Sequence, residues 1–184
     1  MMDRQQALEL VKKNVRARNL IKHMLATEAV MKALAARFGE DEEKWALAGL
    51  LHDIDYDETA HDPDRHSLVG GEMLRELGLP EDLVYAVKAH NEAHGLVRET
   101  RLDKALYAVD PLTGLLVAAA LIHPEKKLSA IDVGFVMNRF KESSFARGAN
   151  RDQIKSCSEL GLSLEEFIGI GLGAMQAISQ ELGL

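Results

Sequence analysis

Several ionisable side chains lie on helix faces that are otherwise apolar. One such face steps by three and four residues and contains a single histidine: Leu20, His23, Thr27, Val30 and Leu34. His52 and Asp53 end a second apolar run, and His90 ends a third, formed with Leu83 and Val87. A buried imidazole or carboxylate without a partner costs several kcal/mol. We therefore predict that these groups pair with one another or with a cation.

Asp110 adds a second carboxylate, but it also has a purely structural interpretation. An aspartate followed by Pro111 is typical of a helix start, with the aspartate as N-cap and the proline in the first turn. Asp110 also lies one turn after Leu106, on the side of that helix that should meet the core. The sequence leaves both roles open, because each carboxylate oxygen can serve one of them.

The periodicity along the chain is helical and predicts an all-α fold. Helices are expected at about residues 3–15, 19–38, 41–53, 66–77, 81–91, 101–109, 111–122, 131–141, 150–160 and 164–182. Glycines at positions 39, 78, 161 and 183 are predicted helix stops, and Ser163 with Glu166 fits a capping box. Without a strand pattern, repeat or linker, we expect a single-domain helical bundle over residues 1–184. Its core would span about residues 19–122, and C-terminal helices at about 131–183 would complete it.

Charge and composition restrict the partners. The formal net charge is -7, and the stretch from Asp41 to Asp64 holds nine acidic residues against one lysine. A nucleic-acid duplex is not an expected partner, because affinity for phosphate backbones comes mainly from clustered Lys and Arg. No secretory signal is evident, and the longest apolar run, Leu115–Ile122, is shorter than the roughly 18 residues that a membrane-spanning helix needs. Cys157, the only cysteine, is expected to be a reduced thiol, so we predict a cytoplasmic protein without a membrane partner.

Two patterns resemble functional motifs without meeting their requirements. Gly169, Gly171 and Gly173 imitate a phosphate-binding loop, but no strand precedes them, so close helix packing is the better interpretation. His90 and His94 are four residues apart, but a zincin needs glutamate directly after the first histidine, where Asn91 stands. We therefore exclude a metalloprotease.

The order His23, then His52 with Asp53, then Asp110 resembles the signature of the HD-domain metal-dependent phosphohydrolases, an all-α superfamily named after its adjacent His-Asp pair. Four longer segments resemble the same superfamily around these residues and around two further histidines: Ala46–Ile54, His66–Gly71, Ala86–His90 and Leu102–Asp110. The similarity covers about residues 19–122 and is strongest as an ordered set.

The resemblance implies a helical bundle with a site for one or two divalent ions. A mononuclear site would use His23, His52, Asp53 and Asp110. In a binuclear site Asp53 would bridge, and His66 with His90 would hold the second ion. Mixed imidazole and carboxylate ligands suit Fe, Mn, Co or Ni, or Mg if oxygens dominate. Such ions lower the pKa of a bound water and neutralise phosphoryl charge, and the substrate would be a small phosphorylated molecule, a nucleotide first of all.

The sequence departs from the family pattern after the doublet. Many HD proteins have a glycine and then a lysine there, whereas this chain continues Ile54-Asp55-Tyr56. Arg65 and Lys104 are the candidates for the missing positive charge, and solvated surface positions are the alternative for both. Asn91 after His90 does not fit the cyclic-dinucleotide branch. The segment after Asp110 lacks the acidic residue and arginine expected of hydrolases that cleave dinucleoside tetraphosphates.

Three functional hypotheses follow from these residues. The first is a metal-dependent phosphohydrolase acting on a nucleotide, dinucleotide or other small phosphate ester through a metal-activated water. The second is a regulatory or ligand-binding HD module that keeps the metal site with little or no turnover, which the missing lysine favours. The third is a structural helical protein whose histidines and aspartates form a hydrogen-bonded cluster. A homo-oligomer is compatible with all three.

Overall fold

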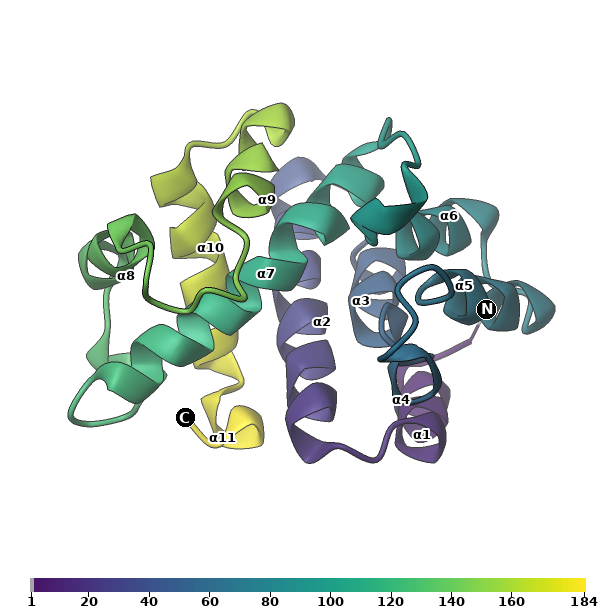
Figure 1. Ribbon diagram of the computed structural model, residues 1–184, viewed down its shortest axis with the longest axis horizontal. Coiled ribbons are helices and arrows are strands. Elements are labelled where there is room, and N and C mark those ends of the chain that lie inside the picture. The colour runs from purple at the N-terminus through teal and green to yellow at the C-terminus, as the bar shows by residue number, and fades with distance from the viewer. Residues whose placement is uncertain (1) are drawn as a thin grey trace.

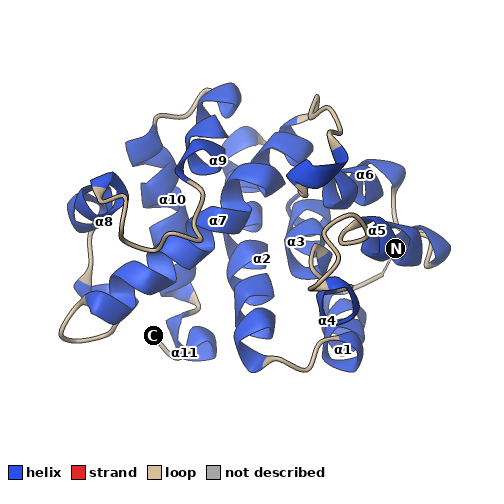
Figure 2. Cartoon of the chain, in the orientation of Figure 1, coloured by secondary structure: helices blue, strands red, loops and turns tan. Residues whose placement is uncertain are grey.

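The computed structural model describes residues 2–184, and all regular secondary structure within them is helical (Figure 2). The first part contains α1 (Arg4–Asn14), α2 (Arg18–Phe38), α3 (Glu42–Leu51), α4 (Tyr56–Thr59), α5 (Leu68–Glu76), α6 (Glu81–Ala89) and the 3-10 turn η1 (Glu92–His94). The second part contains α7 (Arg101–Ile122), η2 (Leu128–Ala130), α8 (Val133–Lys141), α9 (Arg151–Lys155), η3 (Ser156–Leu160), α10 (Leu164–Ala177) and α11 (Ser179–Leu182). The prediction of an all-α fold is confirmed.

Helices α2 and α7 cross in the middle of the molecule and organise the rest (Figure 1). Helix α2 packs against α3, α7 and α10, and α7 also contacts α6, α8 and α9. In the view of Figure 1, helices α1 and α3 to α6 lie on one side of this crossing and α8 to α11 on the other. Large side chains that are fully buried fill the interior, among them Met24, Leu34, Leu50, Leu106 and Leu112. Segments far apart in sequence therefore meet around α2 and α7.

The predicted helix break at Asp110 is wrong, because α7 continues through Pro111 without interruption. A proline inside a helix has no N–H to give to the carbonyl four residues earlier, here that of Tyr107. The Gln153 side chain of α9 replaces that donor, with its Nε2 at 2.8 Å from the Tyr107 carbonyl oxygen. Asp110 is consequently a helix-interior residue and not an N-cap.

Several other boundaries differ from the prediction for local reasons. The helix expected at 150–160 is α9 followed by the 3-10 turn η3, the one expected at 164–182 is interrupted at Ile178, and α4 was not predicted. All four glycine stops are confirmed by positive φ angles. Ser163 caps α10 by accepting from the Glu166 amide, but the reciprocal half of the predicted capping box is absent, because the Glu166 carboxylate pairs with Arg37.

Glycines allow helices to approach closely at two places. A Cβ on Gly171 of α10 would lie 2.8 Å from a methyl carbon of Leu112, so the packing interpretation is confirmed for this glycine. Gly173 faces open space and has no such role. A Cβ on Gly49 of α3 would lie 2.7 Å from the carbonyl oxygen of Thr27. Because that neighbour is backbone of α2, it cannot move aside independently of its helix.

We therefore expect Gly49→Ala to push α2 and α3 apart and to lower the free energy of unfolding by about 3 kcal/mol. Chemical denaturation followed by circular dichroism measures the change. Gly173→Ala is the matched control, since its Cβ would meet no atom within 4 Å. Alanine is the better helix former, so this variant gains up to about 1 kcal/mol. Equal stability of the two variants would contradict the close approach at Gly49.

Helix α7 is, among the described residues, the one that is long and apolar enough to cross a membrane by length and composition. Of its most apolar stretch, 61% is buried inside the protein. A buried core helix passes the same test, so this feature carries little weight as a membrane signal. Its apolar residues pack against α2, α6 and α10.

Candidate metal centre

Six side chains from five parts of the chain converge at the crossing of α2 and α7. His23 lies within α2, His52 caps α3 and is followed by Asp53, and Asp110 lies within α7. The other two members are His66, just before α5, and His90, at the end of α6. They form two groups that share Asp53, and in each group the candidate ligand atoms lie within 4.8 Å of one another. All six are the residues that the sequence predicted as metal ligands.

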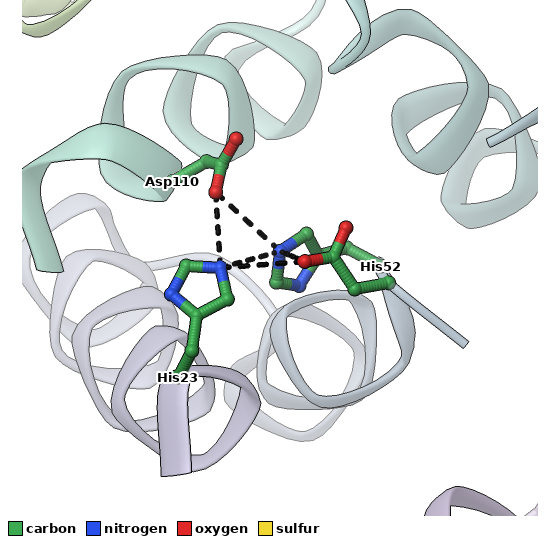
Figure 3. A group of neighbouring side chains, drawn as sticks. His23, His52 and Asp110 are labelled. Carbon is green, nitrogen blue, oxygen red and sulfur yellow. Dashed lines mark hydrogen bonds and ion pairs between the residues drawn. The ribbon is translucent and has the colours of Figure 1, made fainter. Parts of the chain in front are cut away.

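The first group consists of His23, His52, Asp53 and Asp110 (Figure 3 labels three of them). The Nε2 atoms of His23 and His52 face each other at 3.1 Å. Asp110 Oδ1 lies 3.0 Å from His23 Nε2 and 3.6 Å from His52 Nε2. Asp53 Oδ2 lies 3.5 Å and 3.3 Å from the same two nitrogens. Two imidazoles and two carboxylates thus direct one atom each at a common point.

The second group uses the other oxygen of Asp53. Oδ1 of this carboxylate lies 3.3 Å from His66 Nε2 and 3.5 Å from His90 Nε2. The two oxygens of Asp53 are therefore divided between two pairs of imidazoles, and the side chain is almost completely buried between them. This is the arrangement that a carboxylate bridging two ions requires.

Backbone carbonyls fix the orientation of two of the four rings. His52 Nδ1 lies 2.8 Å from the Gly49 carbonyl oxygen, and His90 Nδ1 lies 2.5 Å from the Val87 carbonyl oxygen. In both cases the acceptor is three residues earlier, in the last turn of the helix that the histidine caps. A carbonyl only accepts, so Nδ1 carries a proton in either ring, and the ring can present an Nε2 lone pair to the centre only when it has no second proton.

Side chains fix the other two rings. The Thr113 hydroxyl donates to the Asp110 carbonyl oxygen at 3.0 Å, so its own oxygen is free to accept from His23 Nδ1 at 2.9 Å. His66 Nδ1 donates to Asp55 Oδ1 at 3.0 Å. Such outer partners set the tautomer of metal-binding histidines and raise their basicity. All four rings therefore present Nε2 inward.

Asp55 and Thr113 are the residues of this site that sequence reasoning missed. Asp55 is 2% exposed, and its Oδ2 accepts the backbone N–H groups of Ser67 and Gly70, both at 2.8 Å. It thus holds the start of α5 as well as the His66 ring. The available signals were an acidic residue two positions after the doublet and a threonine one turn after Asp110 on an apolar helix. Neither signal indicates a role in the site before the fold is known.

The centre favours positive charge. Desolvation alone would lower the pKa of His23, but hydrogen bonds with Asp110 and Asp53 outweigh it and raise that pKa to about 9. Desolvation opposes the charge on His66 as well, but Asp53 and Asp55 raise its pKa to about 9. Burial disfavours an ionised Asp53, yet the neighbouring imidazoles hold the pKa of that carboxyl well below its usual range. At neutral pH, protons supply the positive charge in the metal-free protein.

The donor set fits a divalent cation of the first transition row. Two Nε2 lone pairs at 3.1 Å repel each other unless a proton or a cation lies between them. Imidazole nitrogens together with carboxylate oxygens are ligands that Fe, Mn, Co, Ni and Zn accept. This His/Asp cluster is therefore able to hold a metal ion, and the identity of the ion is open.

Binding of a divalent ion at pH 7 should release protons, because His23 and His66 have pKa values of about 9 in the metal-free protein. We expect at least about one proton released for each chain that becomes loaded, and apparent metal affinity that rises from pH 6 to pH 9. Isothermal titration calorimetry with Mn²⁺ in buffers of different ionisation enthalpy measures the number. Metal binding with no proton release would contradict this protonation state.

Neither predicted source of extra positive charge reaches the six side chains. Arg65 is 52% exposed and pairs with Glu58 at 2.8 Å. Lys104 is half-buried on α7 and forms no ion pair within residues 2–184. The remaining histidines lie outside the cluster: His61 is exposed, His123 is half-buried against the Phe135 ring, and His94 Nε2 lies 2.6 Å from the His66 carbonyl oxygen. The site has no arginine or lysine among the groups just described.

Two cavities open beside His23. One of about 420 Å³ is lined by His23, Asp110, Pro111 and Gly114 on one side and by residues 146, 148, 149 and 153 on the other. A second, of about 370 Å³, is bounded by His23, Lys22, Thr113 and Leu121 and by the last residues of the chain. A small molecule can therefore approach the first group from the side of α7 that faces the C-terminal helices.

The helical fold and the His/Asp cluster place this protein in a known class. The sequence model of the HD domain matches residues 20–120, and the chain belongs to this family. Because the match includes His23, His52, Asp53, His66, His90 and Asp110, the convergent site lies wholly within it.

Related proteins support the assignment over different lengths. An uncharacterized protein of Methanocaldococcus jannaschii is 31% identical over 162 residues, which is 84% of this chain and 92% of that protein. Ribonuclease Y of Lawsonia intracellularis is 32% identical over 103 residues, which is 56% of this chain and 20% of that protein. Ribonuclease Y of Desulfotalea psychrophila is 28% identical over 137 residues, with 26% of its length covered. The chain thus spans about a fifth to a quarter of the Ribonuclease Y proteins.

Proposed function

We propose that this protein is a metal-dependent phosphohydrolase that cleaves a small phosphate ester, with a nucleotide or dinucleotide as the substrate class. One observation carries the proposal: Asp53 divides its two oxygens between two pairs of inward-facing imidazoles. A hydrogen-bonded core cluster needs no such division. The division suits two ions, one that His23, His52, Asp53 and Asp110 would hold and a second that Asp53, His66 and His90 would hold.

The residues around the site would have distinct tasks. Bound ions supply a nucleophilic water near neutral pH and neutralise charge on the phosphoryl oxygens. His23, His52 and Asp110 would hold one ion, and the hydrogen bonds of the Nδ1 atoms to carbonyls and side chains prevent the rings from rotating away. Asp53 belongs to both groups of side chains and thereby fixes how far apart the two groups lie. Burial of His52 and Asp53 excludes bulk water from the inner side of the centre.

The negative charge around the site fits a phosphate-binding centre only if cations are bound there. The acidic stretch from Asp41 to Asp64 would repel a phosphate group. Bound divalent ions are the largest local charges in such a site and reverse this repulsion. Metal loading is therefore a condition for phosphate binding in this proposal.

A regulatory HD module with a metal site and little turnover is the second candidate. It is favoured by the absence of a lysine shortly after the His-Asp doublet. The chain has Asp55 in that segment, and this carboxylate accepts hydrogen bonds from His66, Ser67 and Gly70. In this version the site would bind a phosphorylated ligand without cleaving it.

The deciding experiment is a substrate screen on protein loaded separately with Mn²⁺, Fe²⁺, Co²⁺, Ni²⁺ and Mg²⁺. The panel contains nucleoside mono-, di- and triphosphates, dinucleoside tetraphosphates and, because several relatives are named ribonucleases, a single-stranded oligoribonucleotide. We expect metal-dependent cleavage of at least one small substrate, measured by chromatography of its products, and loss of this cleavage with EDTA. If elemental analysis shows bound metal and no member of the panel is cleaved, the enzyme proposal fails and the regulatory module replaces it.

A further inference from the structure

The cavity beside His23 has a second wall that lies outside the HD-matched segment. His23 and Asp110 form one side, and Ala146, Gly148 and Ala149 form part of the other. These three residues belong to the loop between α8 and α9, which we call the 143–149 loop. The cavity measures about 420 Å³, which leaves room for a phosphate group and part of the molecule that carries it.

The half-buried guanidinium of Arg151 holds this loop in shape. Arg151 donates to the carbonyl oxygens of five residues, Phe140, Glu142, Phe145, Ala146 and Ala149, and the distances for the last two are 2.9 Å and 2.8 Å. Burial lowers the pKa of Arg151. Because all of its donors face the loop carbonyls, Arg151 is not available to a ligand. It acts as a positioning residue for the loop.

The direction of these carbonyls determines where the amides point. In a trans peptide the C=O and N–H bonds are antiparallel, and the described residues contain no cis peptide. Since the carbonyls of Phe145 and Ala146 point at Arg151, the N–H groups of Ala146 and Arg147 point away from it. Neither amide donates to another protein atom within residues 2–184. The first of these free amides belongs to Ala146, which lines the cavity, and the second to the residue that follows it.

Ala146 has a backbone conformation that alanine rarely adopts. Its φ of 45° is one of three positive values among the non-glycine residues of the described chain. Left-handed geometry costs an alanine about 1 kcal/mol and is retained where the surroundings impose it. Successive amides next to a left-handed residue form a concave anion-binding arrangement. The left-handed residue thus carries one of the two free amides and directly precedes the other.

Arg147 is an unpaired cation in the 143–149 loop, next to the cavity lining. It is exposed, lies between two residues that line the cavity, and forms no ion pair within the described residues. By contrast, Arg65 is paired with Glu58 and borders neither cavity beside His23. An unpaired guanidinium suits phosphate because its N–H groups match two phosphate oxygens at once.

We propose that the 143–149 loop binds the phosphate group of the substrate through the Arg147 guanidinium and the amides of Ala146 and Arg147, across the cavity from His23 and Asp110. The inference rests on the proposed phosphohydrolase function and deepens it. It assigns to the C-terminal part of the chain the recognition of the anion, while the HD-matched part supplies the metal centre. The missing lysine after the His-Asp doublet is then compensated from another element.

The test measures binding of inorganic phosphate to Mn²⁺-loaded protein by isothermal titration calorimetry. For Arg147→Ala we expect the Kd for phosphate to rise at least about tenfold, and the KM for a cleaved ester to rise with it. Arg147→Lys should recover part of the loss, since lysine keeps the charge without the paired geometry. Metal content from elemental analysis should stay at the wild-type value in both variants.

Arg37→Ala is the matched control. This variant also removes one exposed arginine. Arg37 lies 14 residues after His23 on α2, which corresponds to about 21 Å along the helix. Its phosphate affinity should equal that of the wild type. Lys22→Ala tests the neighbouring cavity, which Lys22 lines together with His23.

The outcomes separate this inference from the proposed function. If wild-type protein cleaves esters but Arg147→Ala binds phosphate unchanged, the loop proposal is wrong and the phosphohydrolase stands. A loss found in Lys22→Ala instead would place the anion in the other cavity and would equally overturn the proposal. If metal-loaded wild type neither binds phosphate nor cleaves any ester, both fail.

Discussion

Replacing Asp53 by asparagine is expected to remove metal from both halves of the centre and to lower turnover by at least about a thousandfold. The asparagine amide has the same shape as the carboxylate but no negative charge. In the wild type, both oxygens of the Asp53 carboxylate face imidazole nitrogens. Metal ions contribute several kcal/mol of transition-state stabilisation, and about 4 kcal/mol corresponds to a thousandfold in rate. Elemental analysis and initial rates on the same preparation measure the two effects.

The control is Asp64→Asn, which removes one exposed carboxylate from the same acidic stretch. We expect its metal content and turnover to match the wild type, because solvent and salt screen the charge of a single exposed carboxylate. Circular dichroism verifies that both variants are folded. A folded Asp53→Asn protein that keeps about two ions per chain would disprove the bridging arrangement.

The second large effect is the stability lost when metal is removed. An ion that binds only the native state stabilises it by about 4 kcal/mol at a thousandfold excess over its Kd. For a chain of 184 residues, each kcal/mol shifts Tm by about 2–4 °C, so stripping the metal should lower Tm by roughly 10 °C. Differential scanning calorimetry before and after EDTA treatment and dialysis measures this shift.

The Asp53→Asn variant provides the internal reference, because EDTA should leave its Tm almost unchanged. Metal-binding wild-type protein whose Tm does not respond to chelation would favour the hypothesis of a hydrogen-bonded structural cluster. Restoration of Tm by Mn²⁺ but not by Ca²⁺ would agree with the imidazole-rich donor set, since Ca²⁺ prefers oxygen ligands.

The sequence predicted the helices and the inner residues of the site because both depend on local patterns. Apolar stripes identify helices, and the ordered histidines and aspartates interrupt those stripes. What it could not provide depends on contacts between distant segments. The course of α7 through Pro111 depends on Gln153, which lies 46 residues from the carbonyl that it satisfies. The roles of Asp55 and Thr113 likewise exist only after α5 and α2 have packed beside them.

The anchoring of the four rings has a consequence for how this site can change during evolution. Each half contains one imidazole held by a main-chain carbonyl, which no substitution can delete, and one held by a replaceable side chain, Thr113 or Asp55. Mutational drift can therefore retune one ring in each half while its neighbour keeps its orientation. The two groups are separately adjustable. A single substitution at Thr113 or Asp55 would weaken the affinity of one group for its ion and leave the affinity of the other group unchanged.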